Sequence, residues 1–337
     1  MADWFETLFG FPESEAAVHQ RLWVDEDALV DRVSGKRYRF GKLSTPTLAE
    51  LRIQSEPVRR ELAGTLRASQ VVANVQELHR DPASRGATFQ VASQFNLLEM
   101  LSPDYSPEDG VTIYGQDKTQ GPACAIACGA ATVYRNYFAP VSDQIGQTRS
   151  HQINCLSQIE LLLQSEHRGL WQMRNGYCLP TAEGLANINQ DLRQDPNLAA
   201  TIKAKLQVGI QENAAVTFSN QAAETDGPQA VTQVFCSALP VAYSHLSKDL
   251  WQSFASLVLE AAYEATFHAA CLNSAQTGNR TLFLTLLGGG AFGNDPECIH
   301  AAIRRCFRNF ADVGLEIVIV SYGSADPAVD ELVANCC

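Results

Sequence analysis

The sequence predicts an α/β fold, and three observations lead to that class. Uncharged runs of alternating apolar and β-branched residues, which are typical of buried strands, recur along the chain. Between them lie stretches with apolar residues at helical spacing, and strands that alternate with helices favour helices packed on a central sheet. Apolar residues make up 46% of the 337 residues and no internal repeat is present, so we expect one large domain with additions.

Residues 1–65 are expected to form an extension ahead of this domain. Residues 22–41 alternate apolar and polar side chains on either side of Ser34-Gly35, a pattern that indicates a β-hairpin. A helix is predicted to begin after Thr47, because Thr47 and Glu50 have the spacing of a capping box. Few residues of the extension are of catalytic types, so we expect it to cover the domain rather than to supply its chemistry.

A region rich in polar and acidic residues spans positions 68–138. Strands are predicted at 69–75 and 87–96, and loops with Pro, Ser and Asp follow them. The loop at 115–122 leads into a helix of small residues, in which Pro122 is expected at the first position. The acidic residues of these loops are Glu99, Asp109 and Asp117.

Residues 144–212 are expected to form a largely helical insertion, because apolar side chains recur there at helical spacing. After this insertion, strands are predicted at 216–219 and 231–243. Residues 248–273 have a full apolar face and predict a long helix, and residues 315–320 predict a last buried strand.

The most informative stretch follows that long helix. Thr281–Leu287 predicts a buried strand, and four glycines occur within the next six residues, 288–293. Asp295 and Pro296 are of the residue types that begin a helix, and an amphipathic run over 297–310 follows them. A strand, a glycine loop and a helix N-terminus together present free N–H groups to an anion. A tight turn without a ligand is the alternative interpretation.

Composition and motifs argue against several other classes. The net charge of −12 gives no basic footprint for nucleic acid. No apolar run approaches the ~20 residues of a membrane span. The absence of Gly-x-Ser-x-Gly and of Gly-x-x-x-x-Gly-Lys-Ser/Thr argues against a serine hydrolase and a P-loop NTPase. The ten cysteines include no C-x-x-C pair, so no metal site is expected.

The cysteines and the chain ends bear on location. Thiols inside apolar segments indicate a reducing compartment, and we expect the cytoplasm. The first residues lack the basic start and apolar core of a secretion signal. Residues 326–337 are expected to form a C-terminal tail, and its final Cys336-Cys337 has no C-a-a-X context for lipidation.

The order of the predicted elements and the glycine loop resemble the macrodomain superfamily, and in particular its poly(ADP-ribose) glycohydrolase branch. In that branch a strand ends in a Gly-x-Gly-Ala/Val-Phe-Gly-Asn/Gly-Asp loop that cradles the diphosphate of ADP-ribose, and Gly288–Asp295 matches this loop closely. Val91–Asn96 is similar to the strand whose final Asn holds the distal ribose. The resemblance covers about residues 68–325 and implies a three-layer α/β/α sandwich with a mixed sheet over 66–325.

The chain departs from the glycohydrolases because it lacks their glycine-rich catalytic loop and their paired-glutamate signature. In their place stand Glu99, Asp109 and 117–122. This arrangement resembles the arginine-directed branch of macrodomain hydrolases, in which acidic side chains replace that signature. The expected activity is removal of ADP-ribose from protein side chains, arginine above all. A non-catalytic ADP-ribose reader and a poly(ADP-ribose) glycohydrolase are the alternatives.

The chemistry of this reaction points to carboxylates. Hydrolysis through an oxocarbenium-like transition state needs a carboxylate for water or for the positive charge, and an acid for the leaving group. A guanidinium would also be bound by carboxylates. Asp117 is the first catalytic candidate, followed by Asp109 and Glu99. A helix cap, a turn and a salt bridge are the respective structural alternatives.

The expected ligand is ADP-ribose carried by a modified protein, without a cofactor, nucleic acid or membrane partner. Asn96 is expected to contact the distal ribose, and Asn74 and Tyr322 the adenine. The remaining expected contacts, to phosphate and ribose, are Thr119, Gln120, Gly121, Gly288, Gly289, Gly290, Ala291, Phe292, Gly293 and Asn294.

Overall fold

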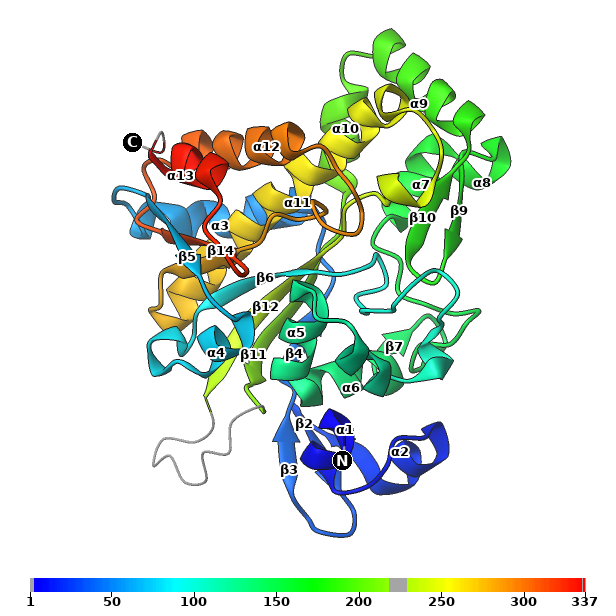
Figure 1. Ribbon diagram of the computed structural model, residues 1–337, viewed down its shortest axis with the longest axis vertical. Coiled ribbons are helices and arrows are strands. Elements are labelled where there is room, and N and C mark those ends of the chain that lie inside the picture. Colours follow the sequence, from blue (N-terminus) through cyan, green and yellow to red (C-terminus); the bar gives the residue numbers. More distant parts are fainter. Residues whose placement is uncertain (1–2, 218–228, 335, 337) are drawn as a thin grey trace.

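The computed structural model describes residues 3–217, 229–334 and 336. Seven strands form one mixed sheet (Figure 1). Their order across the sheet is β4 (Lys42–Ser44), β11 (Gly209–Ala215), β12 (Ala230–Cys236), β6 (Thr88–Ala92), β13 (Thr281–Leu284), β14 (Glu316–Ser321) and β5 (Arg67–Val72).

Five neighbouring strands of this sheet run in the same direction. β12, β6, β13, β14 and β5 run parallel, whereas β11 is antiparallel to β12 and to β4. The carboxyl ends of the five parallel strands therefore lie on the same side of the sheet. In open α/β sheets, ligands bind beside the carboxyl ends of the strands.

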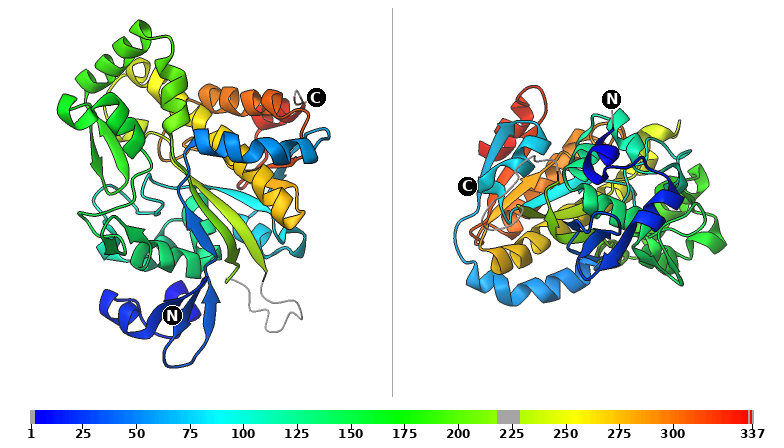
Figure 2. Two further views of the ribbon diagram at one scale, coloured as in Figure 1. Left: turned by 180° about the vertical axis from the view of Figure 1, so that it is seen from behind. Right: turned by 90° about the horizontal axis from the view of Figure 1, so that it is seen from below.

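Helices cover both faces of the sheet, so the predicted α/β/α class is confirmed. One face carries α3 (Leu48–Glu61), α11 (Lys248–Thr277) and α12 (Pro296–Asn309), and the other carries α4 (Val75–Arg80), α5 (Gln120–Ala127) and α6 (Gly129–Tyr137), as Figure 2 shows. α13 (Pro327–Ala334) packs against β5 and α12, so a helix occupies most of the predicted C-terminal tail. Among the described residues, no helix has the length and apolar character that crossing a membrane requires.

The N-terminal residues join this sandwich through β4 and α3. They contain α1 (Trp4–Phe9), α2 (Glu15–Arg21) and an antiparallel sheet of β1 (Leu22–Asp25), β2 (Ala28–Asp31) and β3 (Arg37–Arg39). The predicted hairpin is therefore three strands, because a second turn at Glu26 splits its first half. The predicted capping box of Thr47 and Glu50 begins α3, and β4 pairs with β11 in the central sheet.

The insertion after α6 is only partly helical. Its elements are β7 (Pro140–Val141), β8 (Gln144–Ile145), α7 (Ser157–Leu163), α8 (Ser165–Arg168), β9 (Trp171–Arg174), β10 (Tyr177–Pro180), α9 (Ala182–Gln194) and α10 (Leu198–Lys205). The hairpin β9–β10 turns at Asn175 and Gly176, which both have positive φ, as a type I′ turn requires. Helical periodicity alone did not predict this hairpin.

Further boundaries differ from the predictions. The strand expected over 231–243 is β12 and ends at Cys236, and the strand expected over 281–287 is β13 and ends at Leu284. The helix expected to begin at Pro122 begins at Gln120 and breaks at Cys128, so α5 and α6 are separate helices. The strand expected over 87–96 ends at Ala92, because the residues after it fold into a loop. Of the strand expected over 216–219, Val216 and Thr217 lie beyond the end of β11, and residues 218–219 are outside the described residues. Short 3-10 helices complete the structure: η1 (Pro82–Ser84), η2 (Pro107–Asp109), η3 (Thr112–Gln116) and η4 (Val241–Tyr243).

Candidate active site

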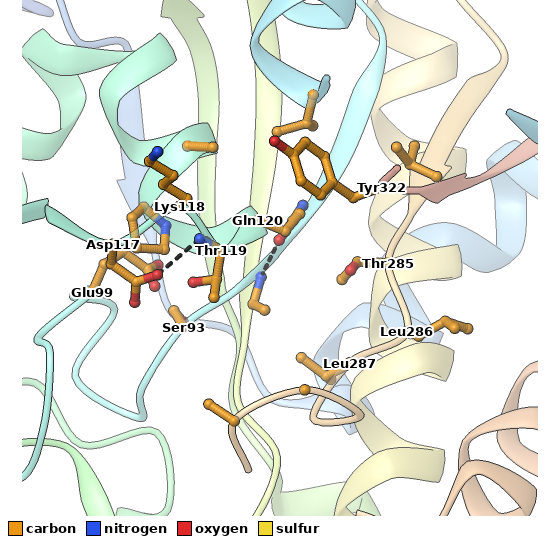
Figure 3. Close-up of a pocket in the computed structure, with 18 of the residues that line it drawn as sticks. Ser93, Glu99, Asp117, Lys118, Thr119, Gln120, Thr285, Leu286, Leu287 and Tyr322 are labelled. Atoms are coloured by element: carbon orange, nitrogen blue, oxygen red, sulfur yellow. Dashed lines mark hydrogen bonds between the residues drawn. The ribbon is translucent and has the colours of Figure 1, made fainter. Parts of the chain in front are cut away.

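A cavity of about 1370 Å³ lies at the carboxyl edge of the parallel strands. Each of these strands is followed directly or within two residues by a residue that lines it: Asn74 after β5, Ser93 after β6, Ala238 after β12, Thr285 after β13 and Tyr322 after β14. Figure 3 shows Glu99 and Asp117 on the opposite side of this cavity from Thr285, Leu286 and Leu287. The sheet thus collects residues from distant parts of the sequence around one space.

The glycine loop after β13 forms one wall of the cavity. Gly288 has φ +77°, and its backbone carbonyl accepts hydrogen bonds from the N–H and the side-chain amide of Asn294. Within the described part of the chain, the N–H groups of Gly290, Ala291 and Phe292 donate to no acceptor, and all three residues line the cavity. Successive free N–H groups of this kind bind anions.

The start of α12 does not take part in this wall. Asp295 caps the helix, and its side chain accepts a hydrogen bond from the N–H of Glu297 at 2.9 Å. The predicted start of this helix is confirmed, but its first turn does not line the cavity. The candidate anion-binding surface is therefore the loop with its open N–H groups, rather than the end of the helix.

The loop after β6 carries Glu99 into the cavity and is held rigidly. The side chain of Gln94 bonds to both the N–H (2.8 Å) and the carbonyl (3.3 Å) of Met100. Leu97 has φ +64°, which a branched side chain rarely adopts, and its carbonyl accepts a hydrogen bond from the buried guanidinium of Arg135. Backbone strain that is held in place by such contacts is typical of functional sites.

Glu99 is a buried carboxyl group in a cavity wall. Its side chain is 2% exposed, and its Oε1 has no hydrogen-bond partner among the described residues. Burial holds the pKa of Glu99 well above the usual 4.5; the nearby Arg135 guanidinium opposes this rise, and the charge of Asp117 adds to it. Glu99 therefore retains its proton to a higher pH than an exposed glutamate, which suits a general acid.

Asp117 approaches the same part of the cavity from the loop before α5. Its Oδ1 accepts a hydrogen bond from the N–H of Thr119 at 2.8 Å, and its side chain is half-buried (Figure 3). Gln120 ties α5 to β6, since its side chain bonds to the N–H of Ala92 and the carbonyl of Gln90. These contacts place the Asp117 loop beside the Glu99 loop. The side chains of Asp117 and Glu99, from two separate loops, therefore lie next to each other in the cavity wall.

Gly121 allows that close approach. A Cβ at this position would lie 2.0 Å from the carbonyl oxygen of Ala92 and 2.3 Å from Glu99 Oε2. We expect Gly121→Ala to lower the free energy of unfolding by about 1–3 kcal/mol, because the backbone of β6 cannot yield. Thermal denaturation measures this loss. Gly115→Ala is the control, since its Cβ would meet only Trp4 at 3.6 Å. Equal stability of the two variants would contradict the packing described here.

Aromatic side chains complete the wall next to the carboxyl groups. The rings of Tyr177, Tyr243 and Phe292 all line the cavity and lie 5.4–5.7 Å apart. The hydroxyl of Tyr177 donates to the carbonyl of Met100 at 2.9 Å, directly after Glu99. Tyr322 also lines the cavity but is 77% exposed, so its ring is free to pack on a flat ligand.

The structure brings most of the predicted site residues to this cavity. Asn74 lies at its rim, where the side-chain oxygen caps α4 by accepting from the N–H of Gln76. The other predicted residues that line it are Glu99, Asp117, Thr119, Gln120, Gly121, Gly288, Gly290, Ala291, Phe292 and Tyr322.

Five predicted residues do not line the cavity. Asn96 is fully buried, where its amide donates to Gln152 and its Oδ1 accepts from the N–H of Leu98. Asp109 lies in η2, and its carboxylate accepts hydrogen bonds from the N–H and hydroxyl of Ser106. Each therefore organises its own loop. The other three are Gly289, Gly293 and Asn294. They belong to the glycine loop, and the side-chain amide of Asn294 donates to the carbonyl of Leu239.

Sequence patterns missed several residues of the wall. Tyr177 comes from the insertion, and Asp3 and Trp4 come from the N-terminal extension. The Asn175-Gly176 turn could have signalled the hairpin that carries Tyr177. No local signal connects Asp3 or Trp4 with the cavity, since only tertiary packing brings them there.

Comparisons with known proteins add the following findings. No family model and no curated protein matches the sequence. Among solved structures, the chain is similar to poly(ADP-ribose) glycohydrolase from Thermomonospora curvata, with a TM-score of 0.46, 13% identity and 96% of each chain covered. It is also similar to that from Deinococcus radiodurans in complex with ADP-ribose, with a TM-score of 0.43, 12% identity, and 87% of this chain and 91% of the other covered. The identity is too low to transfer the roles of residues.

Proposed function

We propose that this chain binds ADP-ribose in the cavity and hydrolyses the glycosidic bond between ADP-ribose and a modified protein side chain. One observation carries the proposal: the glycine-loop residues whose N–H groups have no acceptor line the same cavity as two acidic residues, Glu99 and Asp117. An anion-binding loop opposite a pair of acids is the arrangement that a diphosphate-linked sugar requires for glycosidic hydrolysis.

The order of the strands supports one orientation for the proposed ligand. Asn74 and Tyr322 follow β5 and β14, which lie side by side at one end of the sheet. The glycine loop follows β13 in the middle, and the Glu99 loop follows β6 on the other side. Adenine on Asn74 and Tyr322 and a diphosphate on the glycine loop would bring the distal ribose to the carboxyl groups.

The two acids can divide the reaction between them. Glu99, with its raised pKa, donates a proton to the leaving nitrogen or oxygen as the glycosidic bond breaks. Asp117 stabilises the oxocarbenium-like sugar or orients the attacking water. Because Glu99 is only 2% exposed, electrostatic interactions at its carboxyl group are stronger than in bulk water.

We propose arginine as the modified side chain. Besides Glu99, which keeps its proton, the acidic residues that line the cavity are Asp3, Asp117 and Asp326, while Lys118 is the only Lys, Arg or His among its described lining residues. This balance suits a cationic guanidinium, which carboxylates bind through charge-assisted hydrogen bonds. It suits a second, anionic ADP-ribose unit of a polymer less well.

The test compares substrates under one set of conditions. Purified protein is mixed with peptides that carry ADP-ribose on arginine, on serine or on glutamate, and with poly(ADP-ribose), and released ADP-ribose is quantified. Release from arginine supports the full proposal, and release from another substrate alone corrects the acceptor. Binding of ADP-ribose without release from any substrate would identify a reader, and absence of binding would overturn the proposal.

Gly290 provides a test of the binding site that leaves folding intact. A Cβ at Gly290 would meet nothing within 4 Å, so Gly290→Ala is expected to keep the wild-type Tm. Because Gly290 lines the cavity, the added methyl group would separate the loop from a bound diphosphate. We expect the Kd for ADP-ribose to rise by about tenfold, measured by calorimetry.

The adjacent Gly289 is the matched control. Its Cβ would point away from the cavity, toward Ile299 at 3.2 Å. Gly289→Ala should therefore lower the Tm slightly and leave the affinity unchanged. If Gly290→Ala binds ADP-ribose as tightly as the wild type, the diphosphate does not lie on this loop.

A further inference from the structure

Glu13, in the segment between α1 and α2, holds the loop that precedes Asp117. Its Oε1 accepts hydrogen bonds from the N–H of Val111 at 2.8 Å and from the hydroxyl of Tyr137 at 2.7 Å. Its Oε2 accepts from the N–H of Thr112 at 2.7 Å. One carboxylate thus binds the first residues of η3 and connects them to α6.

The backbone at Gly110 and Val111 leaves room for the Glu13 carboxylate. Gly110, just before the bonded N–H groups, has φ +80°, and a Cβ there would lie 2.7 Å from Glu13 Oε2. Trp4, on α1, donates from its indole nitrogen to the carbonyl of Val111 at 3.3 Å. The N-terminal segment therefore grips both the N–H and the carbonyl of Val111.

The clamped element connects the two carboxyl groups of the cavity. η3 begins at Thr112 and ends at Gln116, and the N–H of the next residue, Asp117, bonds to the carbonyl of Tyr114. The buried hydroxyl of Tyr114 accepts a hydrogen bond from the N–H of Glu99 at 3.1 Å. One short helix therefore sets the position of Asp117 at its end and of Glu99 through its middle.

We propose that Glu13 is a positioning residue for catalysis: by fixing the start of η3, it sets the relative position of Glu99 and Asp117. The inference rests on the proposed function and extends it to the N-terminal segment, which contributes Asp3 and Trp4 to the cavity wall. Glu13 does not line the cavity, so its effect is on the acids and not on ligand contacts.

The test separates catalysis from binding. Glu13→Gln replaces one acceptor oxygen by an NH₂ group, which cannot accept from a backbone N–H. We expect kcat to fall by about 10- to 100-fold, because misplacement of catalytic groups by about 1 Å has effects of this size. The Kd for ADP-ribose should stay within about twofold, since the glycine loop lies across the cavity.

Two variants serve as controls. Tyr137→Phe removes one donor to Glu13 but leaves both backbone hydrogen bonds, so kcat should stay near the wild-type value. Glu15→Gln changes an exposed carboxylate two residues away and should have no effect. Hydrogen exchange, followed by mass spectrometry, should be faster in peptides covering 110–117 of the Glu13→Gln variant and unchanged over 281–287.

The outcomes distinguish this inference from the proposed function. Unchanged kcat for Glu13→Gln, or an equal loss in Tyr137→Phe, overturns the positioning role. If the wild type releases no ADP-ribose from any substrate, the proposed function fails and the catalytic role of Glu13 fails with it. Hydrogen exchange still reports on the clamp in that case, and unchanged exchange over 110–117 would show that Glu13 does not hold η3 at all.

Discussion

Replacing Glu99 by glutamine is expected to slow the release of ADP-ribose by roughly 10²- to 10⁴-fold, the usual contribution of a general acid. The amide matches the carboxyl group in shape but has no proton of suitable acidity to give to the leaving group. Binding of ADP-ribose should persist, because the glycine loop is unchanged. Single-turnover release of ADP-ribose, together with calorimetric titration, measures the two properties separately.

The same substitution is expected to stabilise the protein at neutral and alkaline pH. Burial raises the pKa of Glu99 above its usual 4.5, so the folded chain holds this proton more tightly than the unfolded chain does. Tighter binding of this proton stabilises the folded state. That contribution to the free energy of unfolding is fully present below the usual pKa and is lost as pH rises through the raised pKa. The Tm of Glu99→Gln should therefore exceed that of the wild type more at about pH 8 than at about pH 5.

Glu264 supplies a control of opposite sign. Burial opposes its ionisation, but His268 and Arg52 outweigh burial and lower its pKa to about 2. The contribution of Glu264 to stability is present above the usual pKa and is lost as pH falls toward 2. Glu264→Gln should thus lower the Tm at neutral pH and leave turnover near wild type. If Glu99→Gln also lowered the Tm at every pH, Glu99 would be a structural ion-pair partner and not a held acid.

The pH dependence of turnover follows from the same shift. Protonated Glu99 is the active form of the acid, so the rate should fall as pH rises through its raised pKa. The residual activity of Glu99→Gln should lack this alkaline limb. A limb of equal steepness in the variant would assign it to another group.

Local sequence patterns predicted the elements whose signals are local. The cap at Thr47, the start of α12 at Asp295 and Pro296, and the strand before the glycine loop all depend on residues within a few positions of one another. The glycine loop itself was found for the same reason, since close approach and positive φ leave a mark in composition.

Contacts between segments distant in the sequence have no local sequence pattern and were not predicted. Asn96 was predicted at the end of a strand and as a ligand contact, yet its side chain bonds to Gln152 and to the N–H of Leu98. Glu13 is an ordinary glutamate in sequence, and only the packing of α1 beside η3 and of α2 beside α6 gives it three partners. The N-terminal extension was therefore underestimated, because its contribution depends on tertiary structure alone.

Replacing Asp117 by asparagine is expected to reduce the rate of hydrolysis by roughly 10²- to 10⁴-fold without loss of folding. The asparagine oxygen can still accept the hydrogen bond from the N–H of Thr119, so the turn before α5 should persist. What the variant lacks is negative charge beside the developing oxocarbenium ion and beside a cationic acceptor. The KM for an arginine-linked substrate should rise as well, whereas the Kd for free ADP-ribose should change little.

Asp109 offers a closely matched comparison for this change. It also lies in an acidic loop and also accepts a hydrogen bond from a backbone N–H, that of Ser106, but it does not line the cavity. Asp109→Asn should therefore keep turnover within about twofold of wild type if general acid–base chemistry belongs to Glu99 and Asp117. A large loss in Asp109→Asn with wild-type turnover in Asp117→Asn would move the catalytic carboxylate to η2. Because both variants retain their caps, neither result can be attributed to unfolding once the two Tm values agree.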